Sequence, residues 1–182
     1  MFSVRIHGRG GQGVVTAAEL LSVAAHDGGR FAQAFPSFGS ERTGAPVVAF
    51  CRVDDRPIRL REPVLHPDGL IVQDATLLHQ VDVFAGLASD GYVLLNTANP
   101  VSGPANVVTV PATELALTHL GRPVPNIALL GGFVALTGLV PIEALLDAIR
   151  ARFAGQLAEG NVAAALAAHD LVRTTVHNGA LR

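Results

Sequence analysis

Residues 4–13 read Val-Arg-Ile-His-Gly-Arg-Gly-Gly-Gln-Gly, and a helical pattern of apolar residues follows directly. Val4 and Ile6 alternate with polar residues, which is typical of a strand. The sequence therefore predicts a strand over 4–7, a glycine turn, and a helix over 13–25. Such a turn lets backbone N–H groups and the positive end of the helix dipole approach an anion closely.

The spacing of the glycines permits three interpretations. Gly8, Gly10 and Gly13 satisfy G-x-G-x-x-G, the pattern of dinucleotide-binding turns. An NAD or FAD site also needs an acidic residue at the end of the second strand, about 20 residues further on. The strand expected at Phe31–Phe35 contains no carboxylate, so this interpretation is disfavoured. Binding of an anionic group of another ligand and a purely structural tight turn both remain open.

Strand patterns alternate with helical ones along the first two thirds of the chain, which predicts an α/β fold with a mostly parallel sheet flanked by helices. The start is Rossmann-like, the C-terminal part is helical, and we expect a single domain over 1–182. The expected strands are 31–35, 46–53, 57–60, 69–73, 92–96 and 107–110. Residues 76–84 are expected to be helical or a turn with a helix, and 111–120 a helix. Further helices are expected over 127–139, capped by Asn126, from Pro141 onward, and to about Thr175, capped by Asn161.

The composition excludes several kinds of function. Hydrophobic residues make up 49% of the chain, charged residues 15%, and the mean hydropathy is +0.41. We expect another subunit to cover part of this apolar surface, although abundant Ala and Val would give the same value. The net charge of −2 argues against nucleic acid and acidic membranes as partners. All 13 basic residues are Arg, so the chain has no lysine for a P-loop or a Schiff base.

Cys51 is the only cysteine, so this chain alone cannot form a disulfide, a C-x-x-C pair or a cysteine-ligated iron–sulfur cluster. Its apolar surroundings in the sequence favour a packing role over a nucleophilic one. The seven histidines show no metal-binding spacing, and no hydrolase elbow is present. The longest apolar stretch, Ile127–Val140, is too short to span a bilayer. With no signal region at the N-terminus, we expect a cytoplasmic protein without a membrane partner.

The loop from Pro36 to Pro46 has glycines and prolines near both ends, which predicts a shaped, exposed loop. It carries Glu41 and Arg42, and a guanidinium suits a carboxylate or a phosphate. The carboxyl ends of strands in an α/β sheet are where ligands gather, so we favour a functional loop. The alternative is a surface Glu–Arg pair that contributes little.

Taken together, these motifs resemble the gamma subunit of 2-oxoacid:acceptor oxidoreductases, the family of pyruvate:ferredoxin oxidoreductase. The resemblance covers nearly the whole chain, including the stretch 143–161. The residues that carry it are Arg9-Gly10-Gly11-Gln12-Gly13, Thr16-Ala17-Ala18, Phe35-Pro36, Gly39, Glu41-Arg42, Gly44-Ala45-Pro46 and Arg52-Val53.

The resemblance implies oxidative decarboxylation of a 2-oxoacid to an acyl-coenzyme A, with electrons passed to ferredoxin or a similar acceptor. Thiamine diphosphate, Mg²⁺ and [4Fe-4S] clusters would then belong to alpha, beta and possibly delta subunits. No cofactor is expected on this chain alone. Many members have a second Arg at the position of Thr43. The alternative function is a free-standing nucleotide-binding regulatory protein. The resemblance places Arg9, Gly10, Gly11, Gln12, Gly13, Glu41 and Arg42 on the coenzyme A side of the site.

Overall fold

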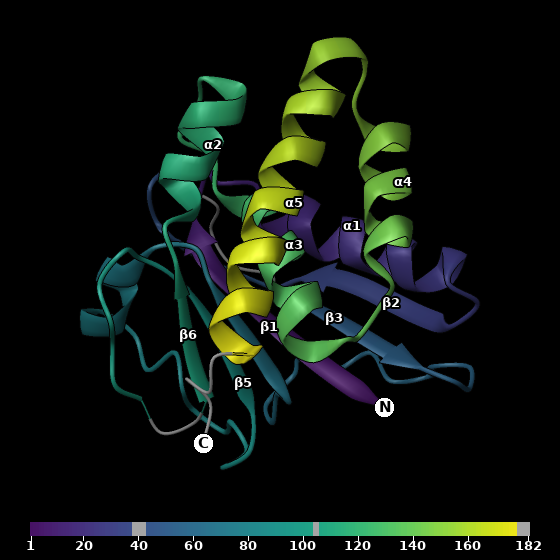
Figure 1. Cartoon of the computed structure of the whole chain (residues 1–182). Helices are drawn as coiled ribbons and strands as arrows, with labels where there is room; N and C mark the ends of the chain where they lie inside the picture. The colour runs from purple at the N-terminus through teal and green to yellow at the C-terminus, as the bar shows by residue number, and fades with distance from the viewer. Residues whose placement is uncertain (38–42, 104–105, 178–182) are drawn as a thin grey trace.

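The computed structural model describes residues 1–37, 43–103 and 106–177. All strands lie in the first two thirds of these residues, with one α-helix and one 3₁₀-helix between them, and the last four elements are helices (Figure 1). The elements in chain order are β1 (Phe2–Arg9), α1 (Val14–Asp27), β2 (Phe31–Pro36), β3 (Pro46–Asp54), β4 (Gly69–Val72), η1 (Ala75–His79), β5 (Tyr92–Asn96), β6 (Asn106–Val110), α2 (Ala112–Leu120), α3 (Asn126–Thr137), α4 (Ile142–Arg152) and α5 (Gly155–His177).

In the described residues, six strands form one sheet in the order β2-β3-β1-β4-β5-β6. β3 runs antiparallel to both of its neighbours, whereas β1 pairs in parallel with β4, β4 with β5, and β5 with β6. β2 therefore points the same way as β1, although β3 lies between them. The α/β class, the mostly parallel sheet and the helical C-terminal part are confirmed.

Two expectations about the middle of the chain need comment. The short strand expected at 57–60 is wrong, because this segment is irregular and joins β3 to β4 without pairing. Proline at position 57 removes a backbone donor, and three arginines (Arg56, Arg59, Arg61) keep the segment at the surface. The helix or turn expected at 76–84 is a 3₁₀-helix, η1, followed by turns.

Both helix caps expected at asparagines are wrong. The N-cap of α3 is Pro125, and Asn126 is already helical; its side chain bonds outward to another element. α5 begins at Gly155, so Asn161 lies inside the helix, where its Nδ2 donates to the carbonyl oxygen of Leu157. In both cases a polar residue before an apolar run satisfies tertiary or mid-helix bonds, which the local pattern does not distinguish from a cap.

The main core lies between one face of the sheet and the helices α1, α3, α4 and α5 (Figure 1). Val4 and Ile6 of β1 point into this core and are fully buried. The Cys51 side chain joins the same face, and burial raises the pKa of its thiol to about 12. The expected packing role of Cys51 is therefore confirmed.

α3 is buried on nearly every side, and glycines allow its neighbours to approach closely. A Cβ at Gly131 would overlap the backbone of Ala165 in α5. A Cβ at Gly132 would meet only side-chain atoms, of Leu94 on β5 and Val172 on α5. The contact between α3 and α5 thus depends on the missing side chain at Gly131.

The other face of β1 is polar and fastens irregular segments to the sheet. The Arg5 guanidinium donates to the carbonyl oxygens of Val64, Val83 and Ala85, at 3.4, 3.0 and 2.6 Å. Its Nε also donates to Nε2 of His7 at 3.0 Å, which fixes a neutral imidazole protonated on Nδ1. Burial, and then the charge of Arg5, lowers the pKa of His7 to about 4.

Replacing Gly131 by Ala should destabilise the fold by about 3 kcal/mol, because a methyl group would force α3 and α5 apart. Gly132→Ala is the matched control on the same helix. Its Cβ would lie 3.1 Å from Leu94 and 3.3 Å from Val172, whose side chains can shift, so the loss should stay under about 1 kcal/mol. Urea unfolding of the two variants measures the difference in the free energy of unfolding. Equal losses of this free energy would contradict the special requirement for glycine at position 131.

The low pKa of His7 predicts a pH-dependent stability. Between pH 6.5 and about 4 the unfolded chain binds a proton at this residue that the folded chain excludes, so stability falls as pH falls. His7→Gln retains an acceptor for Arg5 without titrating. The stability of the natural protein relative to this variant should drop by about 3 kcal/mol between pH 7 and pH 4. Parallel pH curves for the two proteins in urea titrations would contradict this prediction.

Candidate functional site

The glycine turn joins β1 to α1 in the way that the sequence predicted. Gly11 and Gly13 have φ values of +94° and +70°, a region that side-chain-bearing residues rarely adopt. Gly8 is the second-last residue of β1, where a Cβ would stand 2.5 Å from Cγ2 of Val14. The glycines are therefore required by the backbone, whatever the turn binds.

The N-terminus of α1 opens at this turn without a capping side chain among the described residues. Gly13 is the N-cap, and the first bond of the helix runs from the amide of Ala17 to the Gly13 carbonyl at 2.9 Å. The backbone N–H groups of the first turn of α1 have no intrahelical acceptor. The first turn also has no acidic residue. This arrangement leaves the positive end of the helix dipole available to an anion.

A pocket of about 460 Å³ lies at this helix end. One wall is the glycine turn with the start of α1, and the other is the chain that enters β3. Backbone bonds join the walls, since Gly10 donates to Ala45 at 3.0 Å and Gly44 donates to Gly10 at 3.2 Å. The pocket is lined by Arg9, Gly10, Gly11, Gly13, Val14, Val15, Thr16, Thr43 and Val47.

Gln12 supports the turn from behind. Its Oε1 accepts from the backbone amide of Arg9 at 2.8 Å, and its Nε2 lies 3.5 Å from Oδ2 of Asp74. Gln12 does not line the pocket, whereas Arg9, Gly10, Gly11 and Gly13 do. Glu41 and Arg42, the other two expected site residues, lie outside the described residues.

Asp74 and Asn126 take part in the site, and sequence reasoning missed both. Asp74 follows β4 and accepts from Nε of Arg9 at 2.8 Å. Burial alone would raise the pKa of Asp74, but hydrogen bonds from the side chain and backbone of Thr76, together with Arg9, lower it. The signal in the sequence that indicates a role for Asp74 is its position as a carboxylate just after a buried strand, at the edge of the sheet where β1 also ends.

Asn126 links the beginning of α3 to the beginning of α1. Its Nδ2 donates to the Gly13 carbonyl at 3.1 Å, and its Oδ1 accepts from the amide of Ile127 at 2.9 Å. Nearby lies the buried side-chain amide of Gln73. Neither its Nε2 nor its Oε1 has a hydrogen-bond partner within the described ranges. The residues around the turn therefore come from four separate stretches of sequence.

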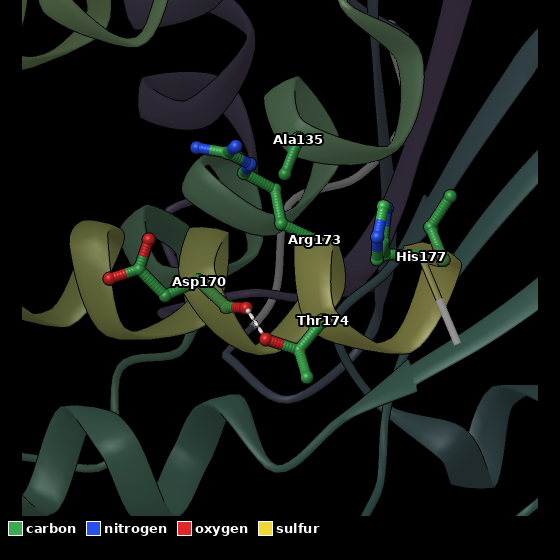
Figure 2. A pocket seen from close by; sticks show the side chains of 6 residues that line it. Ala135, Asp170, Arg173, Thr174 and His177 are labelled. Atoms are coloured by element: carbon green, nitrogen blue, oxygen red, sulfur yellow. Dashed lines mark hydrogen bonds between the residues drawn. The ribbon is translucent and has the colours of Figure 1, made fainter.

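A second pocket, of about 560 Å³, lies against the C-terminal turns of α5 (Figure 2). The hydroxyl of Thr174 donates to the Asp170 carbonyl at 2.9 Å. The side chains of Asp170, Arg173 and His177 are exposed, so water screens the charges of Asp170 and Arg173. This end of α5 lies at the opposite end of the molecule from α2 (Figure 1). Because α2 follows the carboxyl end of β6, the second pocket is remote from the edge where β1 ends.

Other kinds of site find no support in the part of the chain that the structure describes. No three His, Cys, Asp or Glu side chains there lie close enough together to hold a metal ion. None of the helices in those residues combines the length and the hydropathy needed to cross a membrane.

Comparisons with known proteins agree with the motifs around the turn. The family model for pyruvate ferredoxin/flavodoxin oxidoreductase matches residues 3–171. The pyruvate synthase subunit PorC of Methanothermobacter marburgensis is 49% identical over 180 residues, which are 98% of this chain and 100% of that protein. The common subunit gamma of the pyruvate/ketoisovalerate oxidoreductases of Pyrococcus furiosus is 46% identical and covers 93% of this chain and 96% of its own length.

Solved structures share the fold. The pyruvate oxidoreductase subunit PORC of Thermotoga maritima superimposes with a TM-score of 0.83 at 36% identity, over 93% of this chain and 95% of that one. A 2-oxoglutarate:ferredoxin oxidoreductase of Magnetococcus marinus has a TM-score of 0.79 at 14% identity, over 95% of this chain and 31% of that one, and shows the fold alone. With a family model over most of its length and relatives near 49% identity, the chain belongs to the pyruvate ferredoxin/flavodoxin oxidoreductase family, as a gamma-type subunit of a multisubunit oxidoreductase.

Proposed function

We propose that this chain is the gamma subunit of a complex that converts a 2-oxoacid to an acyl-coenzyme A and passes the electrons to ferredoxin or a similar acceptor. Within that complex, its glycine-turn pocket forms part of the coenzyme A side of the active site. The observation that carries the proposal is the uncapped N-terminus of α1, which opens into the pocket between Gly10 and Thr43.

The lining of the pocket suits a ligand with both anionic and amide groups. Backbone N–H groups at the start of α1 bind a phosphate oxygen without a side-chain cation. The hydroxyls of Thr16 and Thr43 can donate to or accept from an amide, while Val15 and Val47 offer apolar contact. Coenzyme A carries phosphates and an amide-bearing arm, so one ligand uses all three kinds of contact. Glu41 and Arg42 remain part of this proposal.

The redox and decarboxylation chemistry is assigned to other chains of the complex. A [4Fe-4S] cluster needs four thiolates, and this chain has only Cys51, which is fully buried in the core. We therefore place thiamine diphosphate, Mg²⁺ and the clusters on alpha, beta and delta partners, and ferredoxin at the complex as a whole. The role of this chain is to bind and orient.

The fold argues against the dinucleotide alternative. In a dinucleotide-binding sheet, the strand after the first helix lies beside the first strand, and its acidic end reaches the ribose. Here β3 separates β2 from β1, and the residues of β2 include no acid. The relatives named above are subunits of oxidoreductases, so a free-standing nucleotide-binding regulator finds no support.

Thr16→Glu tests the proposal without disturbing the helix. Residue 16 is the third residue of α1, where Glu stabilises an N-terminus by reaching back to its free N–H groups. The carboxylate would occupy the anion position. In the assembled complex, we expect the KM for coenzyme A to rise at least tenfold while the KM for the 2-oxoacid stays unchanged.

Two controls define the result. Thr16→Gln has the same size without the charge and should raise the KM less, and Thr174→Glu places the same carboxylate in the second pocket and should change nothing. A KM for coenzyme A that is equal in the Glu and Gln variants would remove the α1 terminus from the site. Titration of the complex with NAD and FAD should show no binding.

A further inference from the structure

Most of the Arg9 guanidinium is engaged by its own chain. Its Nε donates to Asp74 Oδ2 at 2.8 Å, and its Nη1 to the Gly44 carbonyl at 3.1 Å. Its Nη2 donates to Thr76 Oγ1 at 2.6 Å and to Gln80 Oε1 at 3.1 Å. Four of the five N–H groups of a guanidinium are thus used. None of the four acceptor residues lines the pocket.

The positive charge of Arg9 is also compensated where it stands. Asp74 Oδ2 accepts from Nε, and Asp74 Oδ1 accepts from the backbone N and the hydroxyl of Thr76, at 2.9 and 2.6 Å. To reach a phosphate in the pocket, the guanidinium would have to leave a paired carboxylate that is itself only about one-fifth exposed. Removing one partner of such a pair leaves the other charge uncompensated, which is unfavourable.

The four bonds join three segments that are far apart in the sequence. Arg9 belongs to the end of β1, Gly44 precedes β3, and Thr76 and Gln80 belong to η1 and its C-cap. Gly44 follows Thr43, which lines the pocket wall formed by the chain that enters β3. Gly10 and Gly11 line the opposite wall, which is formed by the glycine turn. Arg9 therefore links the two walls and braces both against η1.

We propose that Arg9 is a positioning residue, which sets the separation of the two pocket walls through Gly44 and Asp74 and does not itself bind the anionic groups of coenzyme A. This proposal rests on the proposed function for the meaning of the pocket, but the wall contact itself is independent of any ligand. It differs from a direct contact with coenzyme A, to which the resemblance would otherwise lead for this arginine.

Asp74→Asn separates the two roles. If Arg9 were a phosphate ligand, removing the carboxylate would free the guanidinium and would leave the KM for coenzyme A unchanged or lower. A positioning role predicts the opposite, because the neutral amide has a single acceptor oxygen and cannot accept from both Arg9 and Thr76. We expect Asp74→Asn and Arg9→Ala each to raise the KM at least fivefold in the assembled complex, and the double variant to be no worse than either, since both break one linkage.

A further kinetic readout comes from the charge of the ligand. Loss of a phosphate ligand would raise the KM for coenzyme A more than that for pantetheine, which has no phosphate, and dephospho-coenzyme A would show whether the 3′-phosphate is the group bound. It would also flatten the salt dependence of the KM for coenzyme A. Loss of a positioning residue should raise all three values by the same factor and leave the salt dependence intact. Arg9→Lys should recover only part of the loss, because an ammonium cannot reach Asp74, Gly44 and Thr76 together.

Amide hydrogen exchange tests the wall contact without any ligand. In Arg9→Ala, the amides of Gly10 and Gly44, which bond across the two walls, should exchange at least tenfold faster, while that of Tyr92, bonded to Asp68, should not change. Arg30→Ala is the matched control. It removes a guanidinium that pairs with Asp55 at 2.9 Å and with the Leu139 carbonyl, and it should leave the exchange and the KM unaltered.

The outcomes are distinguishable. Unchanged exchange at Gly10 and Gly44 in Arg9→Ala, or a normal KM in Asp74→Asn, overturns the positioning role. If Thr16→Glu leaves the KM for coenzyme A unchanged, the proposed function fails, while the exchange experiment still decides what Arg9 does to the pocket walls.

Discussion

The left-handed conformation of Gly13 is the constraint on which the rest of the structure depends. At φ +70°, this residue turns the chain from β1 into α1 and acts as the N-cap without a side chain. A side chain at this position would overlap the amide of Asn126. The Gly13 carbonyl accepts both from Ala17 in α1 and from Asn126 in α3. One residue thus fixes the direction of α1, places the start of α3, and leaves the first N–H groups of α1 open.

The position of α3 then determines how the helical layer packs. Because α3 begins against the glycine turn, its middle crosses β5 and α5, and Gly131 allows the close approach to α5. Small residues fill much of the same interface, as the fully buried Ala164, Ala165 and Ala168 of α5 show. The core of the chain itself therefore buries part of this high apolar content, while several large apolar side chains, such as Leu65 and Phe31, stay exposed. A face covered by another subunit stays a prediction of the composition.

Features that depend on local interactions could be predicted from the sequence, whereas features that depend on contacts between distant residues could not. The turn at Gly10–Gly13, helix α1 and strand β5 are specified by local backbone requirements and by apolar periodicity, so they were predicted almost to their bounds. Asn126 and Asn161 resemble caps locally, but their partners are set by packing and chain geometry. The link from Arg9 to Asp74 spans 65 residues, and no local pattern states that the two meet.

The distribution of charge along β1 bears on the proposal that this pocket forms part of a larger site. The guanidinium groups of Arg5 and Arg9 both donate hydrogen bonds to irregular segments of this chain and hold them against the sheet. Of the described residues that line the pocket, Arg9 is the one cation, and Asp74 compensates it. The helix dipole adds roughly half a positive charge at the start of α1. A ligand with several phosphates needs more positive charge than that. In the proposed complex the rest would come from Arg42 or from neighbouring chains, and the relatives named above are themselves oxidoreductase subunits.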